Sequence, residues 1–525
     1  MINPIDPAAR DNTTSDIARL VLDHVRKGLP RDIGDGLTMT TPLRDLGFDS
    51  LTLMETINRI EEQFGMRFRE EWLYDIETCQ DIAELIVAHR TRTNPTLASA
   101  AHLMAAHPPC AAQSTSDSQV ASGAAADPAQ FPECVALEER LAEGAALGLV
   151  NPFFRKNQEV RPPFATMDGR TVLRYTSYDY LDLTSHPEIT RAAIEAIGRF
   201  GTSASASRLV GGEHDLLEEM EQALAQFLRA EAAVVFPSGY GTNASLFGHL
   251  FGSNDLILYD ELAHNSITQG VQLSGAKHRS FRHNDHEALE RLLGDIRGQY
   301  RRAVVAVEGV YSMDGDYPDL PRLMEIKRRH NALLYVDEAH SLGTLGATGR
   351  GICEHFGVDP AEGDLWMGTL SKTLASFGGY LAGPARLIRY LKYTTPGLIF
   401  SAAPPPGNLA ASVAALGVLR REPQRVERLR QNAALFLRLA QQAGLNTGPS
   451  RDTPVIPIIL GNSIRCIRVS NELLQRGIDA RPILYPAVRE SAARLRFFIT
   501  AAHTPEQIEH SIAMLQASLA ATSPP

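Results

Sequence analysis

A lysine at position 372 is the residue of this chain whose surroundings most clearly suggest chemistry. The 525-residue chain has only six lysines, and Lys372 lies among small and hydroxyl side chains in T-L-S-K-T-L-A-S-F-G-G (369–379). The apolar run Leu365–Met367 comes immediately before this segment. A lysine in such a setting is either a surface residue that extends to solvent or a nucleophile. The polar residues that follow other apolar runs distinguish between these alternatives.

An acidic residue ends the apolar segment L-L-Y-V-D-E-A-H. Asp337 stands at the end of a buried strand, and His340 follows in the same loop. A buried carboxylate is unfavourable unless a cation or a strong donor pairs with it, and a pyridinium N–H is such a donor. The segment could also be an ordinary strand end with capping acids. A DEAH-type nucleoside triphosphatase would need a G-x-x-x-x-G-K-[ST] phosphate loop, but the chain contains no G-K dipeptide.

Further polar residues follow other apolar runs. Ser238, Gly239 and Tyr240 come between an apolar run and an expected helix, where free backbone N–H groups suit a phosphate. Alone, this turn is a weak signal, and a lone His264 after another strand would more often be structural. The hydroxyls of Thr369 and Ser371 beside Lys372 also suit a phosphate. Together, a lysine nucleophile, an acid for a ring nitrogen and a phosphate cradle indicate a pyridoxal phosphate pocket.

The elements that position these residues alternate between strand and helix. The expected strands are the apolar runs at 232–236, 256–259, 303–307 and 332–336, and helical patterns cover 186–199 and 320–330. This alternation predicts an α/β fold with a mainly parallel sheet covered by helices, whose strand ends meet at one edge. The pattern restarts after about 406 with two helices and a strand-like V-I-P-I-I-L, which predicts a smaller C-terminal α+β domain.

Composition limits the remaining possibilities. The net charge of −10 and the lack of a basic stripe argue against nucleic acid as a partner. No stretch approaches 18 consecutive apolar residues, and the N-terminus lacks a signal-peptide pattern, so we expect no membrane span and a cytoplasmic location. The five cysteines form no C-x-x-C pair, so neither a disulfide framework nor a metal site is expected.

The first 92 residues form a module of a different kind. Helical patterns at 13–29, 53–64 and 81–89 predict an all-α domain, and Ser50 in D-L-G-F-D-S-L heads the second of these helices. Ser50 could be a simple N-cap. However, the whole module resembles a four-helix acyl carrier domain over residues 12–92, in which the matching serine bears a 4′-phosphopantetheine arm. The Ala-, Ser- and Pro-rich residues 93–131 are expected to form a flexible linker.

Residues from about 150 to 520 resemble the α-oxoamine synthases, which are pyridoxal phosphate enzymes of fold type I. The matching stretches are S-R-L-V-G-G (207–212), V-E-G-V-Y-S-M-D-G-D (307–316), V-D-E-A-H-S-L-G-T-L-G-A-T-G-R-G (336–351), T-L-S-K (369–372) and R-L-R-F-F-I-T-A-A-H (494–503). Five such blocks in the same order are not expected by chance in unrelated chains. The resemblance implies an N-terminal segment at 132–190, a large cofactor-binding domain at 191–405 and a small domain at 406–525.

The resemblance also implies a role for each matching residue. Lys372 would be the Schiff-base lysine and the catalytic acid/base, with Asp337 on the pyridine nitrogen, His340 on the ring oxygen and His264 stacked on the ring. Arg496 would hold the amino-acid carboxylate rather than being a surface arginine. The remaining cofactor-binding residues implied by the family are Ser238, Gly239, Tyr240, Glu308, Ser312, Thr369 and Ser371.

Two departures from the family pattern concern substrate and phosphate binding. The chain has S-Y-D-Y-L-D at 177–182, with Tyr178 and Asp179 near the position of a family asparagine that helps to bind substrate. Ala402 replaces a hydroxyl residue that in several members reaches the partner subunit's phosphate, a role for which Ser401 could substitute. These changes leave open which amino acid is used.

The expected activity is a decarboxylative Claisen-type condensation of an amino acid with an acyl thioester, giving an α-aminoketone. The tethered carrier suggests that the acyl group arrives on the arm of Ser50. A flexible tether raises the local thioester concentration to the millimolar range. The expected partners are a second copy of the chain, a phosphopantetheinyl transferase and upstream fatty-acid or polyketide assembly enzymes. The alternatives are an aminotransferase, and a non-catalytic carrier-linked pseudoenzyme.

Overall fold

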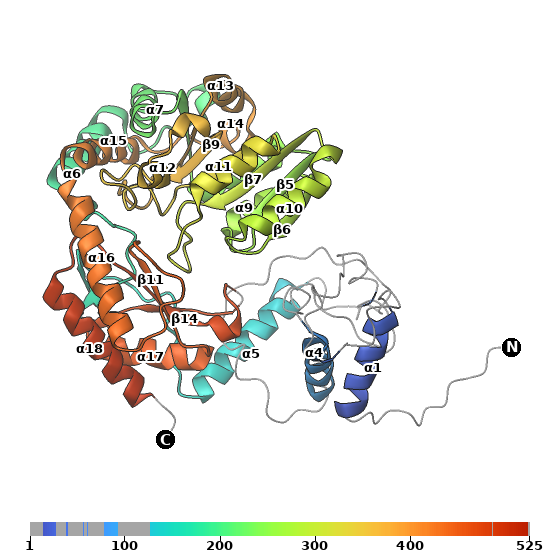
Figure 1. Cartoon of the computed structure of the whole chain (residues 1–525). Coiled ribbons are helices and arrows are strands. Elements are labelled where there is room, and N and C mark those ends of the chain that lie inside the picture. Colours follow the sequence, from blue (N-terminus) through green and yellow to red (C-terminus); the bar gives the residue numbers. More distant parts are fainter. Residues whose placement is uncertain are drawn as a thin grey trace. The chain divides into compact units, whose positions relative to one another are not determined.

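A computed structural model describes residues 14–27, 38–39, 56, 60, 78–92, 127–485 and 487–522 (Figure 1). The chain divides into two compact units, residues 1–100 and 101–525. Ser50 lies outside the described residues, as do residues 93–126 of the expected linker. Within the described ranges, no helix combines the length and the apolar character that crossing a bilayer requires.

The first unit contains two of the helices that the sequence predicts. Helix α1 (Thr14–Lys27) buries Ile17, Val21 and Val25, which recur every four residues and therefore share one face. Helix α4 (Cys79–Arg92) buries Ile82 and Ile86 and packs against α1. Of the expected middle helix, only positions 56 and 60 are described, and both are helical and buried.

A seven-stranded sheet forms the centre of the second unit (Figure 1). Its strand order is β4-β10-β9-β8-β7-β5-β6, and β10 is antiparallel to both of its neighbours whereas the remaining pairs are parallel. Its strands are β4 (Ala232–Phe236), β5 (Asp255–Asp260), β6 (Lys277–Phe281), β7 (Arg302–Glu308), β8 (Leu333–Asp337), β9 (Leu365–Thr369) and β10 (Gly379–Gly383). The predicted α/β fold with a mainly parallel sheet is confirmed.

Two hydrophobic cores cover the two faces of this sheet, which explains why its strands read as continuous apolar runs. Val235 and Val305 belong to one core, and their neighbours Val234 and Val304 belong to the other. Successive side chains of a strand point to opposite faces, so each strand needs apolar residues at nearly every position.

Helices connect the strands and pack on both faces of the sheet. They are α6 (Pro187–Phe200), α7 (Asp215–Leu228), α8 (Gly239–Leu250), α9 (Asn265–Leu273), α10 (His286–Ile296), α11 (Leu320–Arg329), α12 (Ile352–Phe356), α13 (Ala385–Thr394) and α14 (Pro396–Ile399). Helix α15 (Pro406–Arg421) lies beside α6, and α16 (Gln424–Gln442) continues the chain into a second hydrophobic region (Figure 1).

This second region is built on an antiparallel three-stranded sheet in the order β11-β14-β13. Its strands are β11 (Val455–Ile459), β13 (Arg481–Ile483) and β14 (Arg494–Phe498), and its helices are α16, α17 (Ser463–Gln475) and α18 (Pro505–Ala521). Leu495 and Phe497 of β14 enter a core with Phe436. The alternating residues Arg494 and Arg496 therefore point away from that core.

The chain before α6 adds a helix and a small sheet. Helix α5 (Pro132–Ala146) precedes the strands β1 (Glu159–Arg161), β2 (Phe164–Met167) and β3 (Arg170–Arg174). The short strand β12 (Ile478–Asp479) pairs in parallel with β3 and so attaches this segment to the three-stranded-sheet region. The bounds of the five domains and segments expected from the sequence stay a prediction.

Candidate active site

The expected site residues lie together because five strands end at the same edge of the seven-stranded sheet. In the register, Glu308 lies opposite Asp337, and Asp337 lies opposite Met367, two residues before the end of β9. Gly379, the first residue of the antiparallel strand β10, pairs with both Phe236 and Thr369. The loops after β4, β5, β7, β8 and β9 therefore open onto one region, as expected for an open parallel sheet.

Asp337 is held by donors on both of its carboxylate oxygens. It is buried, and its Oδ2 accepts a 2.8 Å hydrogen bond from Asn243 Nδ2 of α8, while Oδ1 accepts one of 2.9 Å from the Ala339 N–H. The Tyr335 hydroxyl donates to Asn243 Oδ1 and so fixes the orientation of the amide. A carboxylate has about four lone-pair sites, so Asp337 can still accept a further N–H.

A chain of hydrogen bonds connects Asp337 with His264. Asn243 Nδ2 also donates to Ser266 Oγ at 2.8 Å, and Ser266 Oγ lies 2.7 Å from His264 Nδ1. The Ser266 N–H donates to the same His264 nitrogen at 3.2 Å, so the imidazole caps the start of α9. The rest of the His264 side chain is exposed, and its ring is therefore free to stack on a planar ligand.

His340 is buried beside a tyrosine that the sequence analysis did not include. The Tyr180 hydroxyl lies 2.7 Å from His340 Nδ1. Burial lowers the pKa of His340 well below its ordinary value, and the nearby Lys372 and Arg496 lower it further, so the imidazole is neutral. A neutral imidazole whose Nδ1 accepts from Tyr180 carries its proton on Nε2, where it can donate to a ligand oxygen.

Lys372 has the properties of a nucleophile rather than of a surface lysine. It is half-buried, and its Nζ lies 5.6 Å from the centre of the Tyr178 ring. Burial lowers the pKa of Lys372 to about 8, although the carboxylates of Asp337 and Glu308 act in the opposite direction. About a quarter of the amine is therefore neutral at pH 7.5, and the neutral form is the one that a Schiff base requires.

Glu308 lies fully inside the site. Burial, followed by the charge of Asp337, raises the pKa of Glu308 well above its ordinary value. Its Oε1 has no hydrogen-bond partner among the described residues, and its other contact is with the Ser312 backbone. A buried carboxyl group with an unused oxygen can form a hydrogen bond with a ligand at this point.

Two close backbone approaches form a cradle at the start of α8. A Cβ on Gly239 would lie 3.0 Å from the Thr369 side chain, and a Cβ on Gly379 would lie 2.4 Å from Thr242 Oγ1 and 2.7 Å from the Ser238 carbonyl oxygen. Ser238 Oγ accepts the Gly241 N–H at 3.0 Å and caps the helix. The first N–H groups of α8 have no partner within the helix, and such groups favour a phosphate.

The hydroxyl residues around Lys372 complete this cradle. Thr369 Oγ1 donates to the Gly378 carbonyl oxygen at 2.9 Å and lies 2.7 Å from Ser371 Oγ. The Ser371 N–H donates to Thr369 Oγ1 at 3.2 Å. The Tyr240 hydroxyl donates to Asn265 Oδ1 at 3.0 Å, and the Tyr240 ring stands edge-on to His264 at 6.3 Å.

One edge of the Arg496 guanidinium group has unused hydrogen-bonding capacity. Nη1 donates to the Ser312 carbonyl oxygen at 2.8 Å, and Nη2 lies 3.5 Å from the Tyr178 hydroxyl. Nε is buried without a partner, and the guanidinium carbon lies 4.5 Å from the centre of the Phe498 ring. The Nε–Nη2 edge is therefore available for a carboxylate, which binds such an edge through two parallel hydrogen bonds.

Two other sequence predictions have different outcomes. Ser401 is half-buried, and no hydrogen bond joins it to the cluster in the part of the chain that the structure describes, so its role stays a prediction. Asp179 is buried and accepts hydrogen bonds from the Leu183 N–H at 2.7 Å and from Thr184 Oγ1 at 2.5 Å. Asp179 therefore fixes the turn that carries Tyr178, and its carboxylate is not free to contact a substrate.

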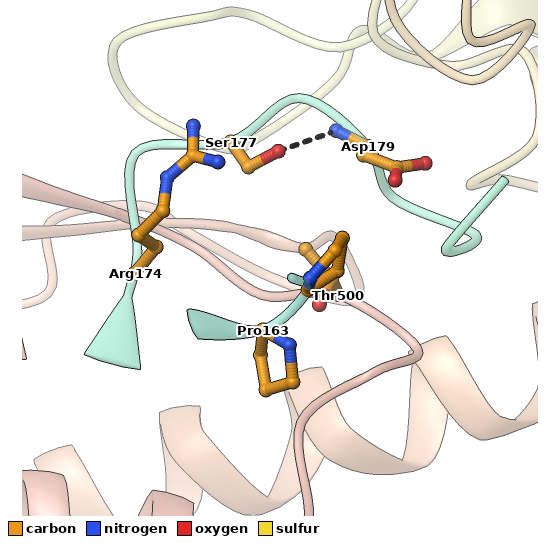
Figure 2. Close-up of a pocket in the computed structure, with 6 residues that line it drawn as sticks. Pro163, Arg174, Ser177, Asp179 and Thr500 are labelled. Carbon is orange, nitrogen blue, oxygen red and sulfur yellow. Dashed lines mark hydrogen bonds between the residues drawn. The ribbon is translucent and has the colours of Figure 1, made fainter. Parts of the chain in front are cut away.

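A small hollow lies beside the turn that carries Tyr178 and is lined by residues that support this turn. Figure 2 shows Arg174 and Thr500 beside the turn, with the Asp179 N–H donating to Ser177 Oγ at 3.2 Å. Its volume of about 10 Å³ is hardly enough for one water molecule. The hollow therefore offers no space for a substrate.

The residues of the site fit pyridoxal phosphate. The start of α8 packs so closely on its neighbours that Gly239 and Gly379 leave no room for a side chain, and the N–H groups of this helix start suit a phosphate. Asp337 can accept one more N–H at a buried strand end. Lys372 supplies an amine with a lowered pKa. A seven-stranded sheet of this order with this site at its edge defines a pyridoxal phosphate-dependent enzyme of fold type I.

Comparisons with known proteins narrow this class. The family model for aminotransferase class I and II matches residues 170–515, and the model for a phosphopantetheine attachment site matches residues 19–86. The 8-amino-7-oxononanoate synthase of Symbiobacterium thermophilum is 39% identical over 366 residues, which cover 70% of this chain and 93% of that protein. The 8-amino-7-oxononanoate synthase 1 of Bacillus subtilis is 36% identical over 359 residues, with 68% and 91% covered.

Solved structures show the same relationship. The serine palmitoyltransferase of Sphingomonas wittichii superimposes with a TM-score of 0.72 at 30% identity, covering 76% of this chain and 99% of that one. The chain belongs to the α-oxoamine synthase family of pyridoxal phosphate-dependent acyltransferases, and it carries in addition a phosphopantetheine attachment domain.

Proposed function

We propose that the enzyme condenses an amino acid with an acyl group carried on its own Ser50 arm and releases an α-aminoketone. The observation that supports this most strongly is that Lys372 and Arg496 both lie beside Tyr178. Lys372 Nζ is 5.6 Å from the centre of the Tyr178 ring, and Arg496 Nη2 is 3.5 Å from its hydroxyl. One amino acid can therefore place its carboxylate on Arg496 and its α-carbon near Lys372.

The residues around the ligand would divide the work. Pyridoxal phosphate, when bound, withdraws electrons from the α-carbon of the amino acid. Asp337 holds the proton on the ring nitrogen, His340 donates from Nε2 to the ring oxygen, and His264 covers one face of the ring. Arg496 fixes the carboxylate through its Nε–Nη2 edge. Lys372 Nζ removes the α-proton and later returns a proton to the same carbon.

The cradle would fix the phosphate, with the N–H groups at the start of α8 and the Ser371 hydroxyl as donors. Thr369, whose proton goes to the Gly378 carbonyl oxygen, would hold Ser371 in place by accepting its N–H. Ser238 and Tyr240 support this helix start, and Ser312 holds Glu308 and Arg496 in place through its backbone. Ser401 would approach the phosphate of a partner subunit in a homodimer, as the family resemblance implies.

The proposed reaction balances without a further reagent. The α-carbon of the amino acid forms a bond with the thioester carbonyl carbon, and the C–S bond breaks. The leaving pantetheine thiol and the α-carbon each take up a proton; the α-proton that Lys372 removes supplies one of them and solvent supplies the other. The carboxylate leaves as CO₂. A tethered donor at millimolar local concentration needs little affinity of its own for the site. The arm requires a phosphopantetheinyl transferase, and a fatty-acid or polyketide assembly enzyme would supply the acyl chain.

Intact-protein mass spectrometry tests this proposal. The pantetheinylated chain is loaded with a short acyl group, single amino acids are added, and the carrier mass is followed together with released CO₂. We expect one amino acid to remove the acyl group and to release CO₂. Lys372→Ala should retain the acyl group although Ser50 is still modified. An aminotransferase would release no CO₂, and full activity of Lys372→Ala would refute the mechanism.

A further inference from the structure

Glu338 of the V-D-E-A-H segment has no role in the function described so far, although its neighbours Asp337 and His340 do. It directly follows β8 and is buried, with only 2% of its surface exposed. Burial raises the pKa of this carboxyl group from 4.5 to about 7, while hydrogen bonds with Ser341 and Ile352 act in the opposite direction. A carboxyl group is almost never buried so completely unless it is paired or hydrogen-bonded, so its contacts indicate its role.

The Glu338 carboxyl group joins the two ends of a loop. It accepts a hydrogen bond from Ser341 Oγ, and its Oε2 and Oε1 accept the Ile352 N–H at 3.2 Å and 3.3 Å. Ser341 begins and Ile352 ends the segment S-L-G-T-L-G-A-T-G-R-G-I, which we call the 341–352 loop. A Cβ on Gly351 would overlap the Glu338 carboxyl group, so the loop can close on this group only because position 351 is glycine.

The 341–352 loop packs against the residue that follows Lys372. Thr373 is buried, and its Oγ1 donates a 2.7 Å hydrogen bond to the Leu342 carbonyl oxygen. A Cβ on Gly343 would overlap the Thr373 methyl group, so the loop and this side chain are in direct contact. The position of the loop therefore limits where the main chain of Lys372 can lie.

We infer that Glu338 is a positioning residue for Lys372. By holding the two ends of the 341–352 loop together, it keeps Thr373, and with it the amine of Lys372, in place. The inference rests on the proposed function, in which Lys372 binds the cofactor. Both partners of the Glu338 carboxyl group are uncharged donors, so the loop needs an acceptor oxygen at the correct distance rather than a negative charge.

Three variants separate the length of the side chain from its charge. Glu338→Gln keeps the length and one acceptor oxygen, which is sufficient because Oε2 accepts from both donors. Glu338→Asp keeps the charge but withdraws the carboxyl group from the loop by one methylene. Thr373→Val keeps the shape and removes the hydrogen bond to Leu342. Asp364→Asn is the matched control, because Asp364 accepts the Leu334 N–H at 2.7 Å at the opposite end of β8 and β9.

The measurement is the rate at which pyridoxal phosphate loads onto Lys372 of the full-length apoprotein, followed by absorbance. A displacement of about 1 Å can slow a positioned reaction about 100-fold, so loading should slow at least about fivefold in Glu338→Asp and in Thr373→Val. Glu338→Gln and Asp364→Asn should load at nearly the wild-type rate. If Glu338 acts through Thr373, the double variant should be no slower than the slower single variant, whereas independent effects would multiply.

Several results would overturn the inference. Unchanged loading in Glu338→Asp or in Thr373→Val would do so, as would effects that multiply in the double variant. Loading of Glu338→Gln as slow as that of Glu338→Asp would show that the charge is required and would also overturn it. An equally slow Asp364→Asn would mean that any loss of stability slows loading. If circular dichroism shows that Glu338→Asp does not fold, the loading rate of Thr373→Val decides the result.

Hydrogen–deuterium exchange keeps this result separate from the proposed function. The amides of the 341–352 loop and of residues 370–376 should exchange faster in Glu338→Asp than in the wild type, but not in Glu338→Gln. If the wild type loads pyridoxal phosphate no better than Lys372→Ala does, the proposed function fails, and faster exchange in both segments still supports the positioning role. If only the 341–352 loop exchanges faster, the inference fails whatever the loading rate.

Discussion

The half-buried His283 gives a prediction whose magnitude follows from the structure. His283 lies between two buried carboxylates, with Nδ1 2.9 Å from Asp260 Oδ1 and Nε2 2.9 Å from Asp316 Oδ2. Burial by itself lowers the pKa of His283, but hydrogen bonds with both carboxylates outweigh it and raise the pKa from 6.5 to about 10. The imidazole is therefore a cation that the folded protein keeps charged at neutral pH.

His283→Gln should therefore destabilise the fold in a pH-dependent way. Because the folded pKa is raised, the stabilisation is fully present below pH 6.5 and is lost as the pH rises through 10. It amounts to about 5 kcal/mol near pH 5, about 3 kcal/mol at pH 7.5 and less than about 1 kcal/mol at pH 10. In a chain of this size, 3 kcal/mol lowers the thermal midpoint by roughly 3 °C.

The assay is calorimetric unfolding of wild type and His283→Gln at pH 7.5 and at pH 10. We expect the difference between their midpoints to be large at pH 7.5 and to shrink towards pH 10. His278→Gln, at an exposed position, is the matched control, and its thermal midpoint should resemble that of the wild type at both pH values. A difference that is equally large at pH 10 would refute the reasoning, because it would mean that lost packing and not lost charge causes it.

The same variant should also affect substrate binding. Asp316 closes a tight turn in which the Tyr311 N–H donates to its carbonyl oxygen at 2.9 Å, and this turn presents the Ser312 carbonyl oxygen to Arg496. The KM for the amino acid should therefore rise more than kcat falls. A purely global loss of stability would lower the amount of active enzyme without changing KM.

Three further predictions concern the site itself. Arg496→Lys removes the bidentate hydrogen bonding to a carboxylate, so the KM for the amino acid should rise about 10- to 100-fold in steady-state assays. An unchanged KM would contradict the assignment. Gly379→Ala places a Cβ 2.4 Å from Thr242 Oγ1, so fluorescence titration of the apoprotein should show pyridoxal phosphate binding weakened at least fivefold. Gly252→Ala, with nothing within 4 Å, is its control. Because the neutral amine reacts and the pKa of Lys372 is lowered to about 8, the rate of cofactor loading should rise through pH 8 and level off above it, and a midpoint near 10.5 would count against the assignment.

The sequence was sufficient to predict most elements that carry the site. The apolar run at 232–236 is β4 itself, and the runs at 303–307 and 332–336 lie within one residue of β7 and β8. These predictions succeed because a sheet covered on both faces needs an apolar residue at nearly every position. Arg496 was expected to be partly buried because Phe497 and Phe498 follow it, and the structure agrees.

The contacts that orient the site could not be predicted from the sequence. Asn243 lies 94 residues from Asp337 and Tyr180 lies 160 residues from His340, so only the folded sheet brings each pair together. Asn243 stands inside a helix, and nothing in its neighbours marks it as a partner of Asp337. The antiparallel direction of β10 was also not anticipated, because direction depends on the connection to β9 and not on the residues of the strand.

The two residues that we propose to hold the amino acid come from different sheets. Lys372 follows β9 of the seven-stranded sheet, whereas Arg496 stands on β14 of the three-stranded sheet. Arg494 donates to Asp314 at 2.6 Å and Arg496 donates to Ser312 at 2.8 Å, so two arginines of one strand tie β14 to the loop after β7. The relative position of Lys372 and Arg496 therefore depends on the contacts between β14 and the loop after β7, and these contacts can loosen before either sheet unfolds. On mild heating or in dilute denaturant, turnover should be lost before the helical circular dichroism signal changes.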